Sequence, residues 1–81
     1  MCEKLERMIE EDLRPFLQTA ASVFEREGDG KRAAEIGDLL QTFAEMIEDI
    51  RNGNMDEWEC GELYEEFGRY RESGEFLERI S

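Results

Sequence analysis

The residues of this chain best suited to chemistry are carboxylates, and they are concentrated between residues 52 and 67. That stretch, NGNMDEWECGELYEEF, holds six aspartates and glutamates together with Trp58, Tyr64 and Phe67, and it has no lysine, arginine or histidine. Three kinds of site would use such a cluster: a calcium loop, an acid catalyst or an acidic docking surface. Because the whole sequence lacks histidine, histidine-based triads and most transition-metal sites are excluded.

A calcium loop of the EF-hand type is the first alternative. Asn52, Asn54 and Asp56 occupy its first, third and fifth positions between two expected helices. The sixth position should be glycine and is Glu57, and the twelfth should be glutamate and is Leu63. The loop would therefore lack both its sharp turn and its bidentate ligand. We interpret these residues as helix caps and a turn, and we expect neither a bound metal nor a cofactor.

The acid-catalyst alternative is a magnesium site shared by two helices, and its carboxylates lie outside residues 52–67. The segment AAEIGDLLQTFAEM resembles the second motif of the MazG-like nucleotide pyrophosphohydrolases, with Glu35 and Asp38 matching its E-x-x-D. The resemblance implies that an E-x-x-E on an earlier helix completes the site, and Glu3 and Glu6 would supply that pair. Magnesium prefers oxygen ligands and activates water on a phosphate. A solvated acidic face explains the same residues without an enzyme, so the hydrolase is the alternative function and a non-enzyme the main one.

A docking surface is the third alternative and the leading one. On a helical wheel Trp58 lies roughly opposite Leu63 and Phe67, away from the core side. An aromatic anchor within an acidic rim is typical of binding hot spots. The competing interpretation is that Trp58 folds over the end of an earlier helix. The predicted partner-binding residues are Glu57, Trp58, Glu62, Tyr64, Glu65 and Glu66, with Gly61 and Gly68 near the same outer face.

The net charge of −12 indicates which partners this surface would bind. Residues 33–68 carry eleven acidic side chains against the single base Arg51, whereas residues 1–32 carry eight acidic and six basic side chains. Such a surface repels the phosphates of nucleic acids and of anionic lipids. We therefore expect a basic protein as partner, with neither direct nucleic-acid binding nor membrane binding.

The predicted function is that of a small acidic, non-enzymatic interaction protein. Carboxylates at three- and four-residue steps of a helix stand about 5 to 6 Å apart and would imitate a row of phosphates. In size and charge the chain is similar to small phage proteins that block host nucleic-acid machinery, including anti-CRISPR proteins. An inhibitor or nucleic-acid mimic is one version of this hypothesis, and a structural assembly module is a further alternative. The sequence has no membrane-length apolar run and no signal peptide, so we expect a soluble protein in the cytoplasm of its own cell or of a host.

The elements that must position these residues are predicted to be helices of one domain over residues 1–81. Apolar residues recur every three or four positions over about residues 3–27, and Pro15 predicts a kink there or two short helices nearly in line. Gly28 predicts the end of that helix, and Asp29 predicts the cap of a second over about residues 31–51.

A third helix is predicted over about residues 56–72, where Asn54 with Glu57, or Asp56 with Glu59, forms a capping box. A short terminal helix then closes one end of the core with Phe76, Leu77 and Ile80. The fold class is therefore all-α: a small bundle of three main helices, the first kinked at Pro15, plus a short C-terminal helix.

The second helix has a wide apolar face with Leu40 near its centre. Leu39 and Met46 widen this face on one side, beyond what one small neighbour covers, so they predict a homodimer contact. Asp12 points into the apolar arc of the first helix. It is either a buried carboxylate with a raised pKa or, because Pro15 breaks the helix nearby, a group that reaches backbone or solvent.

The two cysteines, Cys2 and Cys60, are far apart in the sequence and form neither a disulfide framework nor a zinc site. We interpret Cys2 as a terminal residue and Cys60 as a small apolar filler of the core.

Overall fold

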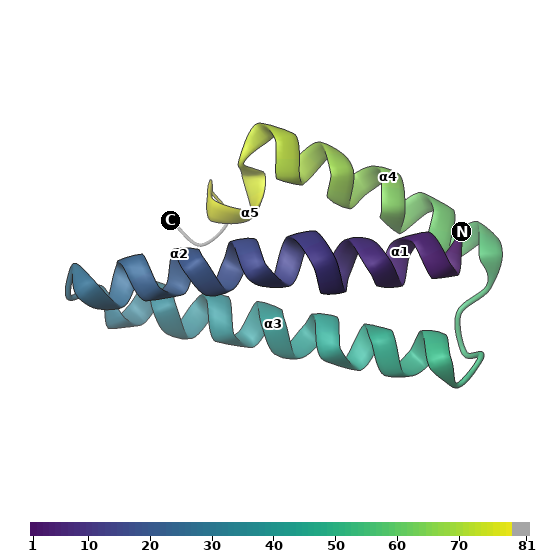
Figure 1. The fold of residues 1–81 in the computed structure, drawn as a ribbon, viewed down its shortest axis with the longest axis horizontal. Coiled ribbons are helices and arrows are strands. Elements are labelled where there is room, and N and C mark those ends of the chain that lie inside the picture. Colours follow the sequence, from purple (N-terminus) through teal and green to yellow (C-terminus); the bar gives the residue numbers. More distant parts are fainter. Residues whose placement is uncertain (79–81) are drawn as a thin grey trace.

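The computed structural model describes residues 1–78 and is an all-α bundle, as the sequence predicts. Its elements in chain order are α1 (Cys2–Met8), the π-helical turn η1 (Ile9–Leu13), α2 (Arg14–Arg26), α3 (Gly30–Arg51), α4 (Glu57–Ser73) and α5 (Glu75–Glu78). The first three follow one another without a break and form a single rod, with α3 on one side and α4 on the other (Figure 1). Within the described chain, every helix is too short or too polar to cross a lipid bilayer.

The irregularity predicted at Pro15 is a π-helical turn directly before the proline. The Arg14 N–H donates to the Ile9 carbonyl oxygen, five residues back, whereas an α-helical N–H donates four residues back. Proline has no N–H, and its ring crowds the preceding helical turn. A wider turn relieves this crowding, so the rod continues through the proline (Figure 1).

The wide turn also keeps four core residues on one side of the rod. Leu5, Ile9, Leu13 and Leu17 are spaced four apart, and each such step passes a full α-helical turn by about 40°. In a regular helix the four side chains would drift around the surface, but a turn with more residues takes up this drift. All four are fully buried, with 0% exposure.

α3 runs antiparallel to the rod and packs chiefly on α2 (Figure 1). α3 begins after the predicted helix end at Gly28 and at the predicted cap Asp29. Gly28 adopts a left-handed φ of 81°, and the Asp29 carboxylate accepts a hydrogen bond from the Arg32 N–H at 3.1 Å. Both predictions are confirmed.

The core face of α3 is centred differently from the prediction. Leu40 is half-buried and packs at the margin of the core. Phe43 is 2% exposed and occupies the centre, because α3 meets side chains from α4 and α5 as well as the rod. The buried residues of α3 are Ala33, Ile36, Phe43 and Ile47.

α4 begins after a turn in which Gly53 has a φ of 73°. Of the two predicted caps, the structure forms the second: the Asp56 carboxylate accepts a hydrogen bond from the Glu59 N–H at 2.7 Å. Asp56 therefore serves the helix start rather than a calcium loop. From this point α4 packs on α1 and then diverges from the rod toward its C-terminal end (Figure 1).

α5 fills the space that opens as α4 diverges. The left-handed Gly74, with a φ of 77°, ends α4 and turns the chain back toward the rod (Figure 1). Phe76 is thereby buried between Phe43 and Phe67, with ring centroids 5.9 Å and 5.8 Å away. The predicted closure of the core by Phe76 is confirmed, whereas Ile80 lies outside the described residues.

A disulfide bond joins Cys2 to Cys60, so the interpretation of the two cysteines as unpaired is wrong. It connects the first turn of α1 to the first turn of α4, with the Cα atoms 4.9 Å apart and 58 positions between them in the sequence. Two isolated cysteines give no sign of pairing, because only the packing of α4 on α1 brings them together. The bond fixes the start of α4 against the rod.

Candidate protein-binding site

Trp58 is the most exposed large apolar side chain in the described structure. It stands in the first turn of α4, just after the Asp56 cap, and 74% of its surface is accessible. Phe67 follows Trp58 by nine positions, which places it on the opposite side of the helix, and it is buried. The interpretation that Trp58 folds over the end of an earlier helix is therefore wrong. Its indole is free to contact another molecule.

Two of the other predicted partner-binding residues share this outer face of α4. Glu62 and Glu65 follow Trp58 by four and seven positions, and both are exposed. We call Trp58, Glu62 and Glu65 the tryptophan face. Arg69, the next residue in this row, is also exposed and places one cation at the far end of the face.

Glu57 lies at the edge of the tryptophan face and binds the N-terminal amine of Met1. This hydrogen bond, together with the positive charge of the amine, lowers the pKa of Glu57 from its ordinary value of 4.5. The carboxylate is fully exposed, so the pair is open to screening by salt. Glu57 is thus ionised at neutral pH and already has a partner.

Tyr64 and Glu66 do not belong to the tryptophan face, although the sequence groups them with it. Both are half-buried, on opposite flanks of α4. Tyr64 faces a hollow on the α1 side, whereas Glu66 lies on the α3 side and accepts a hydrogen bond from the Tyr70 hydroxyl at 2.6 Å. Which neighbour each flank of α4 faces depends on how α4 crosses the rod. The helical wheel of α4 alone does not show this crossing.

Gly61 and Gly68 also face α1 rather than the outer surface. A Cβ atom added to Gly61 would contact the Met1 side chain at 3.6 Å, and one added to Gly68 would contact the Met8 side chain at 3.8 Å. Both glycines are half-buried. These are ordinary van der Waals distances, so α1 would tolerate a small side chain at either position, and neither glycine exposes backbone to a partner.

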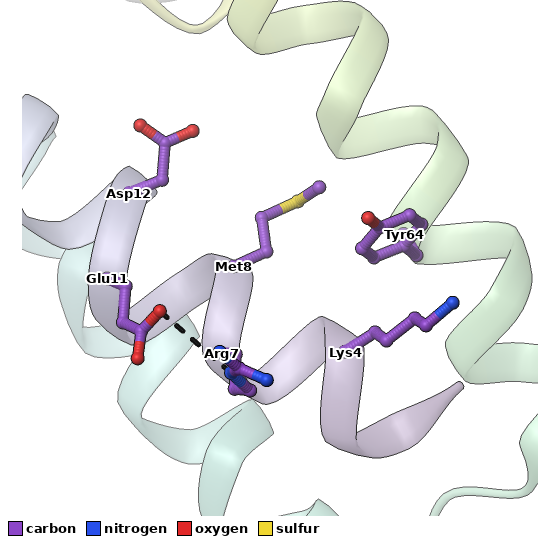
Figure 2. Close-up of a pocket in the computed structure, with 6 residues that line it drawn as sticks. All are labelled: Lys4, Arg7, Met8, Glu11, Asp12 and Tyr64. Atoms are coloured by element: carbon purple, nitrogen blue, oxygen red, sulfur yellow. Dashed lines mark ion pairs between the residues drawn. The ribbon is translucent and has the colours of Figure 1, made fainter.

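The hollow on the α1 side encloses about 320 Å³. Figure 2 shows Met8 pointing toward Tyr64 across it, with Lys4 below and Asp12 at the opposite end. The lining is Lys4, Arg7, Met8, Glu11, Asp12 and Tyr64. Since two cations and two carboxylates line it, and Arg7 pairs with Glu11 at 3.9 Å, the hollow favours neither sign of ligand charge.

Asp12 reaches solvent, which confirms the second of the two expectations for it. Its side chain is 51% exposed and pairs with Arg71 of α4 at 3.3 Å. The Arg71 guanidinium in turn stacks on the ring of Phe16, 3.9 Å from its centroid. Asp12 is thus a link between the π-helical turn and α4 rather than a buried acid.

The structure does not bring the carboxylates of the MazG-like arrangement together. Glu6 pairs with Arg51 at the C-terminal end of α3, at 3.4 Å. Asp38 lies thirteen residues before Arg51 in the same helix, which corresponds to roughly 20 Å. Glu35 is farther still and Glu3 lies at the start of α1, so the two pairs are at opposite ends of α3. Among residues 1–78, no cluster of three or more potential ligands is suited to a metal ion.

The two predicted dimer residues, Leu39 and Met46, line a groove between α3 and α4. The groove consists of two adjoining hollows of about 350 and 330 Å³, which share Thr42 and Met46. We call it the α3–α4 groove. Its apolar lining is Leu39, Phe43, Met46, Met55, Leu63, Phe67, Tyr70 and Phe76, and its acidic lining is Glu35, Asp38, Glu45, Asp49, Glu59 and Glu66.

The ion pairs of the described structure lie outside the α3–α4 groove and the tryptophan face. They connect α1, η1, α2 and the helix ends: Met1 amine with Glu57, Arg7 with Glu11, Arg14 with Glu10, Arg32 with Asp29, Arg51 with Glu6 and Arg71 with Asp12. Carboxylates of the α3–α4 groove and of the tryptophan face have no such partner among residues 1–78. The uncompensated negative charge is therefore concentrated on α3 and α4.

Comparison with known protein families, with characterised proteins and with solved structures finds no significant match to this chain.

Proposed function

We propose that this protein is a small acidic, non-enzymatic interaction protein that binds a basic surface of another protein through its tryptophan face. The observation that carries the proposal is the 74% exposure of Trp58 on a face whose neighbouring side chains are carboxylates. Exposing a large indole to water is unfavourable, so burying it against another protein would be favourable. Aromatic anchors of this kind are enriched at the centres of protein interfaces.

The negative charges of the tryptophan face also favour a basic partner. Glu62 and Glu65 have no ion-pair partner among the described residues, so they are available to a cation on another molecule. Exposed charges of this kind mainly steer the encounter and set which partner is chosen. A basic protein surface fits both the indole and its rim, whereas a nucleic acid would be repelled. Blocking a surface that otherwise binds nucleic acid is one form this function takes.

The cytoplasmic location expected from the sequence has a chemical consequence. Disulfides persist in oxidising compartments, and the thiol systems of the cytosol reduce them. A cytoplasmic protein would therefore carry Cys2 and Cys60 as thiols for much of its life. The redox state of these two cysteines in freshly lysed cells, trapped with an alkylating reagent, reports the compartment directly.

The test of the proposed function is capture of a basic partner from the native host by the immobilised protein, followed by measurements on variants. Trp58→Ala should weaken binding of the captured protein without lowering the melting temperature. Reversal of both Glu62 and Glu65 to lysine should slow association and flatten its salt dependence. The matched control reverses Glu25 and Glu48, which are exposed on α2 and α3 and change the net charge equally. Equal effects of both double variants would show that only total charge matters and would contradict the proposal.

A further inference from the structure

The α3–α4 groove combines an apolar floor with walls of a single charge. Its floor includes three phenylalanines and two methionines, and six carboxylates stand along it: Glu35, Asp38, Glu45, Asp49, Glu59 and Glu66. Neither hollow is lined by a lysine or an arginine among the described residues. None of the six carboxylates forms an ion pair with a described residue, although Glu66 accepts the hydrogen bond from Tyr70.

This groove is a consequence of how α4 is held. The disulfide and the contacts with α1 fix the first turn of α4 on the rod, while its C-terminal part diverges (Figure 1). At the floor of the groove the rings of Phe43 on α3 and Phe67 on α4 are 5.3 Å apart. Above that contact Leu39 and Met46 stay half-buried, because no further element covers them in the described chain.

The length of the groove suits a helix. Glu35 and Asp49 mark its two ends on α3, fourteen positions apart, which corresponds to about 21 Å. Proteins bind amphipathic helices in such grooves by laying the apolar stripe of the helix on the floor. Methionines on the floor adapt to differing side chains, since the thioether chain is flexible and polarisable. The carboxylates would then flank the polar edges of the bound helix.

We propose that the α3–α4 groove binds an amphipathic helix of a partner protein that carries lysine or arginine on both sides of its apolar stripe. The apolar stripe would cover Leu39, Phe43 and Met46, and the cations would pair with the rim carboxylates. This site is separate from the tryptophan face and does not rest on it. A second copy of the same chain is a poorer occupant, because it would bring its own uncompensated carboxylates against those of the groove.

A designed peptide tests the groove without knowledge of the natural partner. The probe is a fluorescein-labelled helix of about fourteen leucines and lysines, with leucine at helical spacing. A lysine-only peptide of the same length controls for charge alone, and a leucine–glutamine peptide, which has no charged side chains, controls for apolar contact alone. Fluorescence anisotropy at physiological salt should show binding of the leucine–lysine peptide, with each control at least about tenfold weaker. Equal binding of the lysine-only peptide, or none of the leucine–lysine peptide, would overturn the proposal.

Two neighbouring residues of α3 provide matched variants. Thr42 is exposed and lines both hollows, whereas Gln41 is exposed, points about 100° away around the helix and lines neither hollow. Thr42→Lys should weaken the leucine–lysine peptide by roughly tenfold or more, and Gln41→Lys by less than about twofold. Trp58→Ala should leave this binding unchanged, which separates failure of the groove from failure of the tryptophan face. Equal weakening by the two lysine variants would mean that the peptide responds to net charge and would overturn the proposal.

Stability and oligomeric state complete the test. Should Thr42→Lys melt at a lower temperature than Gln41→Lys, the double variant Asp38→Asn with Glu45→Gln replaces it, since both carboxylates are exposed. That variant should weaken peptide binding and flatten its salt dependence. Sedimentation that shows a wild-type dimer dissociated by Thr42→Lys would identify a second copy as the occupant. It would confirm the dimer contact predicted at Leu39 and Met46 and overturn the peptide proposal.

Discussion

Reduction of the Cys2–Cys60 disulfide should remove a large part of the stability of this small fold. The bond closes a loop over 58 sequence positions. In the chain-entropy account, a closure of that length destabilises the unfolded state by about 4 kcal/mol. Small domains are stable by only about 5 to 15 kcal/mol in total. For a chain of this size, each kcal/mol corresponds to roughly 4 to 8 °C, so the melting temperature should fall by about 15 to 30 °C.

Circular dichroism of the oxidised and reduced protein measures this difference directly. The double variant Cys2→Ala with Cys60→Ala is the control, and it should melt close to the reduced protein and show no response to reductant. Mass spectrometry after alkylation confirms which state is measured. If oxidised and reduced wild type melted within a few degrees of each other, the bond would not be the constraint that fixes α4 on the rod.

Two further predictions concern the core and the edge of the tryptophan face. Phe43→Ala should cost about 3 to 5 kcal/mol, because the ring is buried and packs against two other rings. Leu40→Ala should cost clearly less, because Leu40 is half-buried. Equal costs of the two substitutions in chemical denaturation would contradict the position of the core. For Glu57 the pKa is lowered in the folded state, so its pair with the Met1 amine stabilises the fold above the unfolded value of 4.5 and is lost as pH falls through the folded value. The melting temperatures of wild type and Glu57→Gln should therefore converge at acid pH, with only a small gap at neutral pH because the pair is exposed. A gap that widens in acid would contradict the assignment.

The helices of this protein could be predicted from sequence because their signals are local. Gly28 and Asp29 determine the start of α3 through backbone conformation and one hydrogen bond, and Asp56 does the same for α4. The apolar spacing also indicated the buried side of each helix. The regular four-residue spacing from Leu5 to Leu17 was the available sign of the π-helical turn, since a regular α-helix does not keep such a row on one face.

The candidate sites could be predicted only in part, because they depend on how helices cross. Trp58 is placed by the cap of its own helix, and the wheel indicated that it points away from the core side, but only the structure excludes packing over the end of an earlier helix. Tyr64 and Glu66 lie on flanks of α4 whose surroundings are set by α1 and α3. The disulfide has the same origin, since Cys2 and Cys60 meet only in the packed structure. The groove beside Leu39 and Met46 arises from the divergence of α4, for which the sequence carries no local signal.

The measurement that tests the proposed function most directly is the affinity of the captured basic partner for wild type and for Trp58→Ala, with the melting temperature of both proteins. We expect Trp58→Ala to lose about 2 kcal/mol or more of binding free energy, roughly thirtyfold in dissociation constant, with no change in melting temperature. Because the indole is 74% exposed, its removal should cost the fold little. A Trp58→Ala protein that melts at a lower temperature and binds the partner as tightly as wild type would contradict the account.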